Sequence, residues 1–148
     1  MIGGDHMGLA EDLAAFSLKL DSAIIDGLEN EVTTQIQAIL SGYLESHTFK
    51  KSRGQFGMGV RDVRNMNPHV EQNGNEFTLK VVDEAEFQAP PISDSDILAE
   101  AVEYGDARYH MKKPRPFIRP TQKKLDSGES EELIATSLRL HGFDCTTV

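Results

Sequence analysis

The most constraining feature of this chain is a long helical periodicity near its N-terminus. Between Leu9 and Tyr43, apolar residues recur every three or four positions, and no proline interrupts them. Steps of three and four place side chains on one face of an α-helix, so the spacing predicts an amphipathic helix with a polar opposite face. The stripe consists of Leu9, Leu13, Phe16, Leu20, Ile24, Leu28, Val32, Ile36, Ile39 and Tyr43.

The length of this helix leaves two interpretations open. At ~1.5 Å per residue it would reach ~50 Å, about three times the length of an average helix of ~11–12 residues. The chain has 148 residues, enough for one domain with a modest core. The helix therefore either packs along its whole length on the chain's own sheet, or protrudes in part and packs on a neighbouring subunit.

A hairpin and a further strand are predicted in the middle of the chain. Asn73-Gly74 is a typical pair for a two-residue hairpin turn, and Phe77, Leu79 and Val81 alternate with more polar neighbours as in a half-buried strand. The segment ILAEAVEYG, residues 97–105, is interpreted mainly as a strand that ends at its glycine. Its alanines leave a helix as the alternative.

A C-terminal helix is predicted to begin at Pro116 or Pro120, because proline suits the first turn of a helix. The sequence Asp126-Ser127-Gly128-Glu129 is a possible break, at which the aspartate and glutamate would form a new capping box. Gly142 is expected to end the helix. The fold class is thus α+β: a long N-terminal helix packed on a small antiparallel sheet, with a C-terminal helix. One domain, residues 9–141, lies between a disordered or artificially added N-terminus, 1–8, and a tail, 142–148.

Composition limits the function classes. The net charge is -9 and the pI is about 4.9, which disfavours general affinity for nucleic-acid phosphate. An acidic wall would instead repel DNA that passes beside it. No apolar run approaches the ~20 residues of a membrane span, no signal peptide is recognisable, and one cysteine, Cys145, cannot form an internal disulfide. No residue set predicts catalysis, a metal site or a cofactor.

The densest basic segment of the chain is KKPRPFIRPTQKK, residues 112–124. Three interpretations of its cations stay open: contact with nucleic acid, salt bridges to an acidic neighbouring subunit, or a solvated loop. Phe117, between the prolines, is expected to anchor the segment on the core. The nucleic-acid interpretation is the weaker one, because stacking aromatic residues are few there.

The order of these parts resembles that of the tail-completion and head–tail joining proteins of tailed bacteriophages. In that family a strand ending in V-E-[FY]-G precedes a P-x-P-F-[LI]-R-P segment that opens the last helix. This chain has VEYG at residues 102–105 and PRPFIRP at 114–120. It departs from the family at Asp106, where threonine is frequent, and it has no clear Thr-Gly-x-Leu-Arg-x-Ser segment after the first helix.

The resemblance implies a structural virion protein without enzymatic activity. Such proteins form rings, commonly hexamers, between the portal or adaptor and the tail tube, and DNA passes through the lumen without specific binding. The expected location is the neck of the virion, after synthesis in the cytoplasm of the bacterial host. The motifs do not distinguish adaptor, head-closure and tail-terminator roles. The alternative is a small binding or regulatory protein that dimerises through the long helix. The candidate subunit-interface residues are Arg53, Phe56, Tyr104, Lys112, Lys113, Arg115, Phe117 and Arg119.

Overall fold

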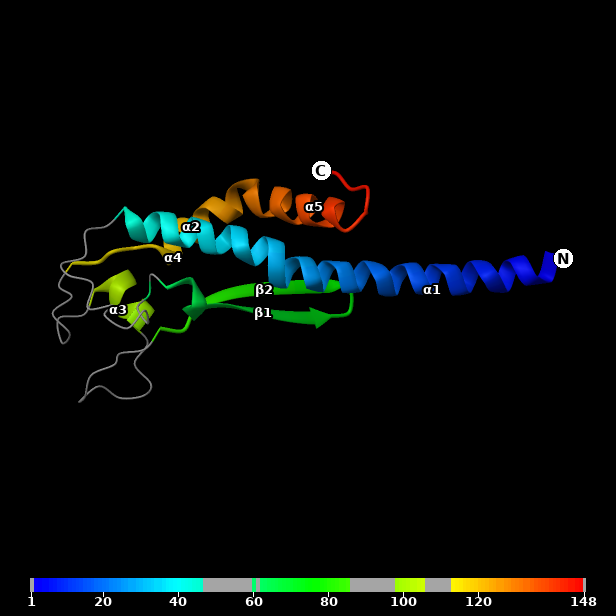
Figure 1. The fold of residues 1–148 in the computed structure, drawn as a ribbon, viewed down its shortest axis with the longest axis horizontal. Helices are drawn as coiled ribbons and strands as arrows, with labels where there is room; N and C mark the ends of the chain where they lie inside the picture. Colours follow the sequence, from blue (N-terminus) through cyan, green and yellow to red (C-terminus); the bar gives the residue numbers. More distant parts are fainter. Residues whose placement is uncertain (1, 47–59, 61, 86–97, 106–112, 148) are drawn as a thin grey trace.

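The computed structural model describes residues 2–46, 60, 62–85, 98–105 and 113–147. One long helix runs through the molecule, with a β-hairpin on one side and the C-terminal helices on the other (Figure 1). This is the expected α+β fold. The elements are α1 (Ile2–Gly27), η1 (Leu28–Val32), α2 (Thr33–Glu45), η2 (Val63–Asn65), β1 (Met66–Asn73), β2 (Glu76–Asp83), α3 (Leu98–Tyr104), α4 (Ile118–Lys124), η4 (Leu125–Glu129) and α5 (Ser130–Leu140).

The predicted long helix is confirmed as the continuous unit α1–η1–α2. Its middle part, η1, is a π-helical turn, and the Thr33 hydroxyl there donates a 2.5 Å hydrogen bond to the carbonyl of Leu28, five residues earlier. From η1 onward the apolar stripe enters the core, with buried residues at Leu28, Val32, Ile36, Leu40 and Leu44. The helix begins at Ile2, within the segment 1–8 that the sequence analysis placed outside the domain.

The hairpin is confirmed, but its turn lies one residue later than predicted. Asn73 pairs with Glu76, so the two turn residues are Gly74 and Asn75. Gly74 has a φ of 62°, in the left-handed region that glycine adopts without strain. Alternate side chains of β2 are half-buried, as predicted, and pack against the core. Gln37 in α2 donates a 2.8 Å hydrogen bond to the Met66 carbonyl, which fixes the hairpin against the long helix.

The predicted strand before Gly105 is wrong, because the segment forms helix α3. Leu98, Ala99 and Glu100 are good helix formers. Ala99 and Val102 are both buried, and their spacing of three fits one helical face. Gly105 has a φ of 78° and follows the last helical residue, as glycine commonly does at a helix C-terminus. Among the residues that the structure describes, the sheet therefore contains only the two strands of the hairpin.

The C-terminal helix is interrupted near its middle, as predicted. Gly128, in η4, has a φ of 105° and separates α4 from α5. The predicted capping box is wrong: Asp126 instead accepts a 2.8 Å hydrogen bond from Gln122, and α5 has no side-chain cap. The predicted stop at Gly142 is confirmed. The N–H of Gly142 binds the Arg139 carbonyl, and that of Phe143 binds the Leu138 carbonyl, which is the Schellman arrangement.

The first part of α1 extends beyond the rest of the molecule. We call residues 9–20 the arm; it projects past the hairpin and past α5 (Figure 1). Leu9, Leu13 and Phe16 are 59%, 60% and 53% exposed. Phe16 also meets the ring of Phe143 edge-on, with 5.8 Å between centroids. The later part of the long helix thus packs on the chain's own core and the arm protrudes, whereas packing of the arm on a neighbouring subunit stays a prediction.

Candidate subunit interface

The two motif segments of the sequence form one joint, and its centre is the carboxylate of Glu103. Glu103 Oε2 accepts hydrogen bonds from the backbone N–H groups of Phe117 (2.7 Å) and Ile118 (2.8 Å). Its Oε1 accepts from the N–H of Arg119 (3.0 Å) and from Arg119 Nε (2.8 Å). These N–H groups open helix α4 and have no partner within the helix. A side chain of α3 thus caps a helix that starts fifteen residues later.

The charge of Glu103 is stabilised although its side chain is only 1% exposed. Burial alone would raise the pKa of this carboxyl. The N–H groups of Phe117, Ile118 and Arg119, together with the Arg119 side chain, outweigh that effect and hold the pKa of Glu103 below its usual value. The positive end of the helix dipole acts in the same direction. Glu103 is therefore a carboxylate, and it accepts four hydrogen bonds.

The joint continues through its neighbours on both segments. The N–H of Arg115 donates a 2.8 Å hydrogen bond to the Val102 carbonyl, so a backbone contact precedes the cap. The Arg119 guanidinium lies over the Tyr104 ring, 4.9 Å from its centroid, in a cation–π contact. These contacts bind α3 and α4 to each other on one side of α2. The sequence contained one signal for this joint, the glutamate of VEYG. Nothing in the sequence identified the N–H groups that this carboxylate binds.

Phe117 is the anchor that the sequence predicted. Its side chain has no exposed surface and belongs to the main hydrophobic cluster. Its carbonyl accepts a 2.6 Å hydrogen bond from the Thr121 hydroxyl, inside the first turn of α4. Phe117 is therefore buried within its own chain, and its side chain does not reach the surface.

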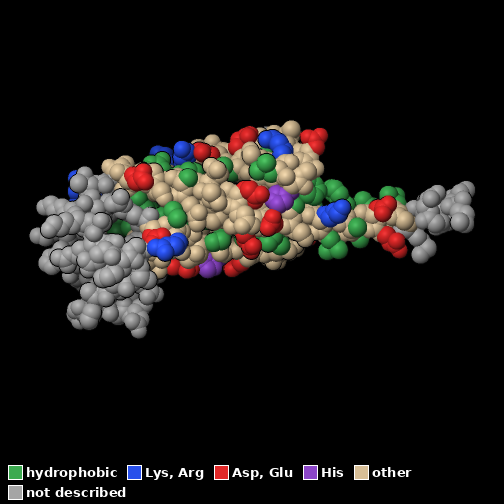
Figure 2. All heavy atoms as spheres, viewed as in Figure 1, with side chains coloured by type: hydrophobic (Ala, Val, Ile, Leu, Met, Phe, Trp, Pro, Cys, Tyr) green, Lys and Arg blue, Asp and Glu red, His purple; other side chains and the backbone are tan. Residues whose placement is uncertain are grey.

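The remaining candidate interface residues divide into two groups. Tyr104, Arg115 and Arg119 are part of the joint, and Lys113 precedes Arg115 by two residues in the chain. Tyr104 is 62% exposed and Ile118 is 40% exposed. Lys123 and Lys124, exposed in the last turn of α4, are further cations of this segment and were not among the predicted residues. Arg53, Phe56 and Lys112 lie outside the described residues. The exposed apolar stripe of the arm, predicted only as a possible contact, is a second candidate surface, and Figure 2 shows hydrophobic side chains along this narrow projection.

A close approach of two helices joins the base of the arm to α5. A Cβ atom at Gly27 would collide with the hydroxyl of Ser137, so only glycine fits there without rearrangement. Nearby, His141 Nε2 lies 3.0 Å from Glu31 Oε1 and 3.5 Å from Asp26 Oδ2. The Ser137 hydroxyl is buried and has no hydrogen-bond partner among the described residues. These contacts fix the direction in which the arm leaves the domain.

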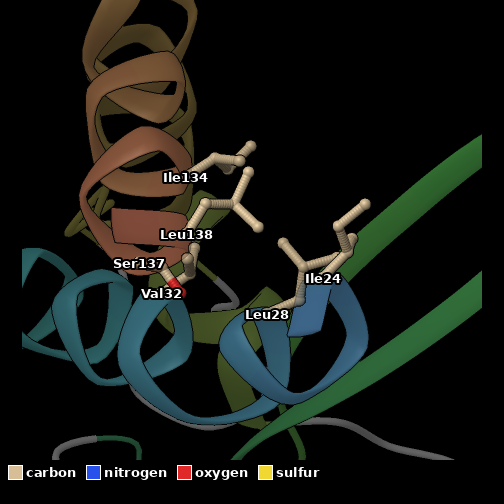
Figure 3. A pocket seen from close by; sticks show the side chains of 6 residues that line it. All are labelled: Ile24, Leu28, Val32, Ile134, Ser137 and Leu138. Atoms are coloured by element: carbon tan, nitrogen blue, oxygen red, sulfur yellow. The ribbon is translucent and has the colours of Figure 1, made fainter. Parts of the chain in front are cut away.

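A small cavity lies at the same junction. Ile24, Leu28 and Val32 line it from the long helix, and Ile134, Ser137 and Leu138 line it from α5 (Figure 3). Its volume is about 10 Å³. A single water molecule needs roughly 10–15 Å³ of such volume, so this is a packing gap and not a ligand pocket.

Asp83, at the end of β2, is a buried carboxyl of a different kind. Its Oδ1 accepts a 3.1 Å hydrogen bond from the Ala85 N–H, while Oδ2 has no partner among the described residues. Burial raises the pKa of Asp83 to about 7; the Ala85 N–H opposes this, and the charges of Asp62 and Glu84 add to it. Near neutral pH the folded protein therefore binds a proton that the unfolded chain releases.

Two features are absent from the part of the chain that the structure describes, a metal cluster and a membrane-spanning helix. No set of three His, Cys, Asp or Glu side chains there is placed to hold a metal ion. No described helix combines the length and the apolar composition that crossing a membrane requires. Comparisons of the chain with protein-family models, with curated proteins and with solved structures found no match.

Proposed function

We propose that this protein is a structural component of a tailed-phage virion, which forms a ring at the head–tail junction. The kind of assembly comes from the resemblance of VEYG and PRPFIRP to the tail-completion and head–tail joining proteins. The structure supports the use of both motifs together, because Glu103 of the first binds the N–H groups of Phe117 and Arg119 of the second. The two segments form one structural unit, so the occurrence of both motifs in one chain supports the resemblance more strongly than either motif alone.

The observation that carries the proposal is the apolar stripe of the arm. Burying a leucine or phenylalanine side chain fully is worth about 1.5–3 kcal/mol. Leu9, Leu13 and Phe16 each expose more than half of their surface, so a large part of that stabilisation is available to a protein partner. Exposed stripes of this kind mark sites of association. A ring of identical subunits supplies such a partner to every copy.

In this proposal the portal or adaptor lies on one side of the ring and the tail tube on the other, in the neck of the virion. DNA passes through the lumen without specific binding, since a chain of net charge -9 repels phosphate. The protein has no catalytic role. The same stripe also favours a second candidate function, a small binding or regulatory protein that dimerises through its long helix.

Native mass spectrometry of the purified chain, alone and mixed with a phage portal or tail-tube protein, separates the two functions. A ring of about six copies, or a monomer that assembles only with these partners, supports the neck protein. A stable dimer that ignores both partners contradicts it and supports the regulatory protein. Leu13→Glu should abolish either assembly. Leu18→Glu is the matched control, because Leu18 is 69% exposed on the opposite face of the same helix.

A further inference from the structure

We propose that the arm of one copy docks on the joint surface of the next copy, in a head-to-tail contact. The joint surface consists of Tyr104, Lys113, Ile118 and Lys123. This inference rests on the proposed ring, for which it names the two surfaces that meet. The partner of the arm is thus a second copy of this chain, bound through a different part of its surface.

The arm offers one continuous apolar strip. Leu9, Leu13 and Phe16 follow each other in steps of four and three, and Leu20 and Ile24 continue the line toward the core. The strip is therefore an exposed extension of a surface that is already covered within the subunit. The arm is helical throughout, so little backbone order has to be gained when a partner binds.

The joint surface offers exposed apolar groups and exposed cations. Tyr104 follows Glu103 in the chain, Ile118 donates its N–H to the Glu103 carboxylate, and both side chains are exposed. Lys113 and Lys123 are exposed on the segment that carries Ile118. Ile118 is held by the Glu103 cap, and the Arg119 guanidinium lies over the Tyr104 ring, so the surface is ordered before a partner arrives. Preorganisation of this kind raises affinity.

The charges of the two surfaces are complementary. Residues 1–49, which include the long helix, contain eight acidic residues and one basic residue. Residues 112–124 contain six basic residues and no acidic one. On the arm itself, Asp12 flanks the strip, three residues after Leu9 and four before Phe16, Glu11 lies on the opposite face with Leu18, and Lys19 is the one basic residue. Contacts between copies that pair these segments bring opposite charges together, whereas arm-to-arm contacts bring like charges together.

The position of the surfaces in the molecule excludes self-docking. The arm projects from one end, and α3 and α4 lie toward the other end (Figure 1). One chain cannot bring its own arm to its own joint, because the rigid unit α1–η1–α2 separates them. A contact between different surfaces of identical subunits is heterologous, and it closes into a ring when the rotation per subunit divides a full turn.

Cysteine cross-linking tests the contact directly. In a Cys145→Ser background, the pair Leu13→Cys and Ile118→Cys is expected to form disulfides between copies on mild oxidation, giving a ladder of multimers on a non-reducing gel. Disulfides need Cα atoms within about 7 Å, so a ladder reports close contact. The matched control pairs Leu18→Cys with Ile118→Cys and should stay monomeric. A second pair, Leu9→Cys with Tyr104→Cys, repeats the test if the first variant fails to fold.

The outcomes separate this inference from the proposed function. A ring in native mass spectrometry without the Leu13–Ile118 cross-link overturns the docking contact while the ring stands. The cross-link without a closed ring supports the contact and argues against the neck role. A strong dimer from Leu13→Cys alone means that arms pair with arms, which also overturns the contact. Absence of both the ring and the cross-link overturns both proposals.

Charge reversal gives an independent readout. Lys113→Glu with Lys123→Glu should weaken association by roughly five- to tenfold in low salt, and by less in high salt. Adding Asp12→Lys, which flanks the strip, to the same chain should restore part of it, whereas adding Glu11→Lys, on the opposite face with Leu18, should not. Reversal at Lys80, exposed on β2, is the control and should leave association unchanged. No effect of the lysine reversals, or no rescue by Asp12→Lys, contradicts the charge pairing.

Discussion

The Glu103 cap makes the sharpest prediction, through the substitution Glu103→Gln. Glutamine keeps the length of the side chain but replaces one acceptor oxygen by an NH₂ group. Two of the four donors that Glu103 now binds would then face another donor. At least one of the three N–H groups at the start of α4 would lose its acceptor, and the pair with Arg119 would lose its charge.

The magnitude follows from the bonds that are lost. A hydrogen bond to a charged group contributes about 1.5–3 kcal/mol. Breaking a buried charged pair by removing one partner costs about 3–5 kcal/mol. Arg119 is more than half exposed and is partly rehydrated, which lowers this cost. We expect Glu103→Gln to reduce the free energy of unfolding by about 3 kcal/mol, a large share of the ~5–15 kcal/mol of a typical domain.

Urea denaturation at pH 7, followed by circular dichroism, measures this loss. The matched control is Glu100→Gln, which removes an exposed carboxylate one helical turn away on α3 and should change stability by less than about 0.5 kcal/mol. A loss of under about 1 kcal/mol for Glu103→Gln, or an equal loss for the control, would refute the view that this carboxylate holds α3 and α4 together.

The pH dependence gives a second check on the same residue. The folded-state pKa of Glu103 is depressed, so its stabilisation is complete above the pKa of the unfolded chain, near 4.5. It is lost as the pH falls through the folded-state pKa. The wild-type protein should therefore lose stability below about pH 4.5 more steeply than Glu103→Gln does. Parallel stability curves for the two proteins below that pH would contradict the assignment.

Three other residues allow further tests. Phe117→Ala should destabilise the monomer by ~3–5 kcal/mol in thermal or urea melts, whereas unchanged melting would mean that Phe117 does not support the core. For Asp83, the folded-state pKa is raised from 3.8 to about 7, so its burial costs stability increasingly as the pH rises through this window. Asp83→Asn should therefore stabilise the protein at pH 8, by up to ~4 kcal/mol, and much less at pH 4; equal effects at both pH values would refute this. Gly27→Ala should destabilise the wild-type protein, because the added Cβ collides with the Ser137 hydroxyl. In a Ser137→Ala background that hydroxyl is gone, so Gly27→Ala should not destabilise the protein and should add a helix-forming gain of up to ~1 kcal/mol.

The parts of the fold that local patterns determine could be predicted from the sequence. The long helix follows from its stripe, the hairpin from alternation beside a glycine turn, and the helix stop at Gly142 from a glycine after a periodic segment. α3 was mistaken for a strand, because Val102, Tyr104 and Gly105 taken alone suit a strand end. The segment forms a helix because its start is rich in alanine and because Ala99 and Val102 are both buried. Their burial depends on packing against the rest of the core.

The candidate site was predicted in part. Phe117 was recognised as an anchor from its place between prolines. Glu103 was missed as the centre of the joint, because its donors lie fourteen to sixteen residues later and no periodic pattern connects them. The exposed part of the stripe could not be separated from its buried part by sequence, since both have the same spacing. The hairpin and α5 lie along the later part of the helix, and their positions decide which part of the stripe is buried and which is exposed.

The π-helical turn η1 has a consequence for the direction in which the arm presents its apolar strip. An α-helix rotates by roughly 100° per residue, so one residue more or less changes the phase of everything on its far side. η1 lies between the arm and α2 in one continuous helix. Deleting a single residue from it would turn Leu9, Leu13 and Phe16 by about a quarter of a turn around the axis, with the core beyond Thr33 unmoved. A length change of one residue therefore changes which side of the arm faces a partner in the proposed assembly, without altering the composition of either surface.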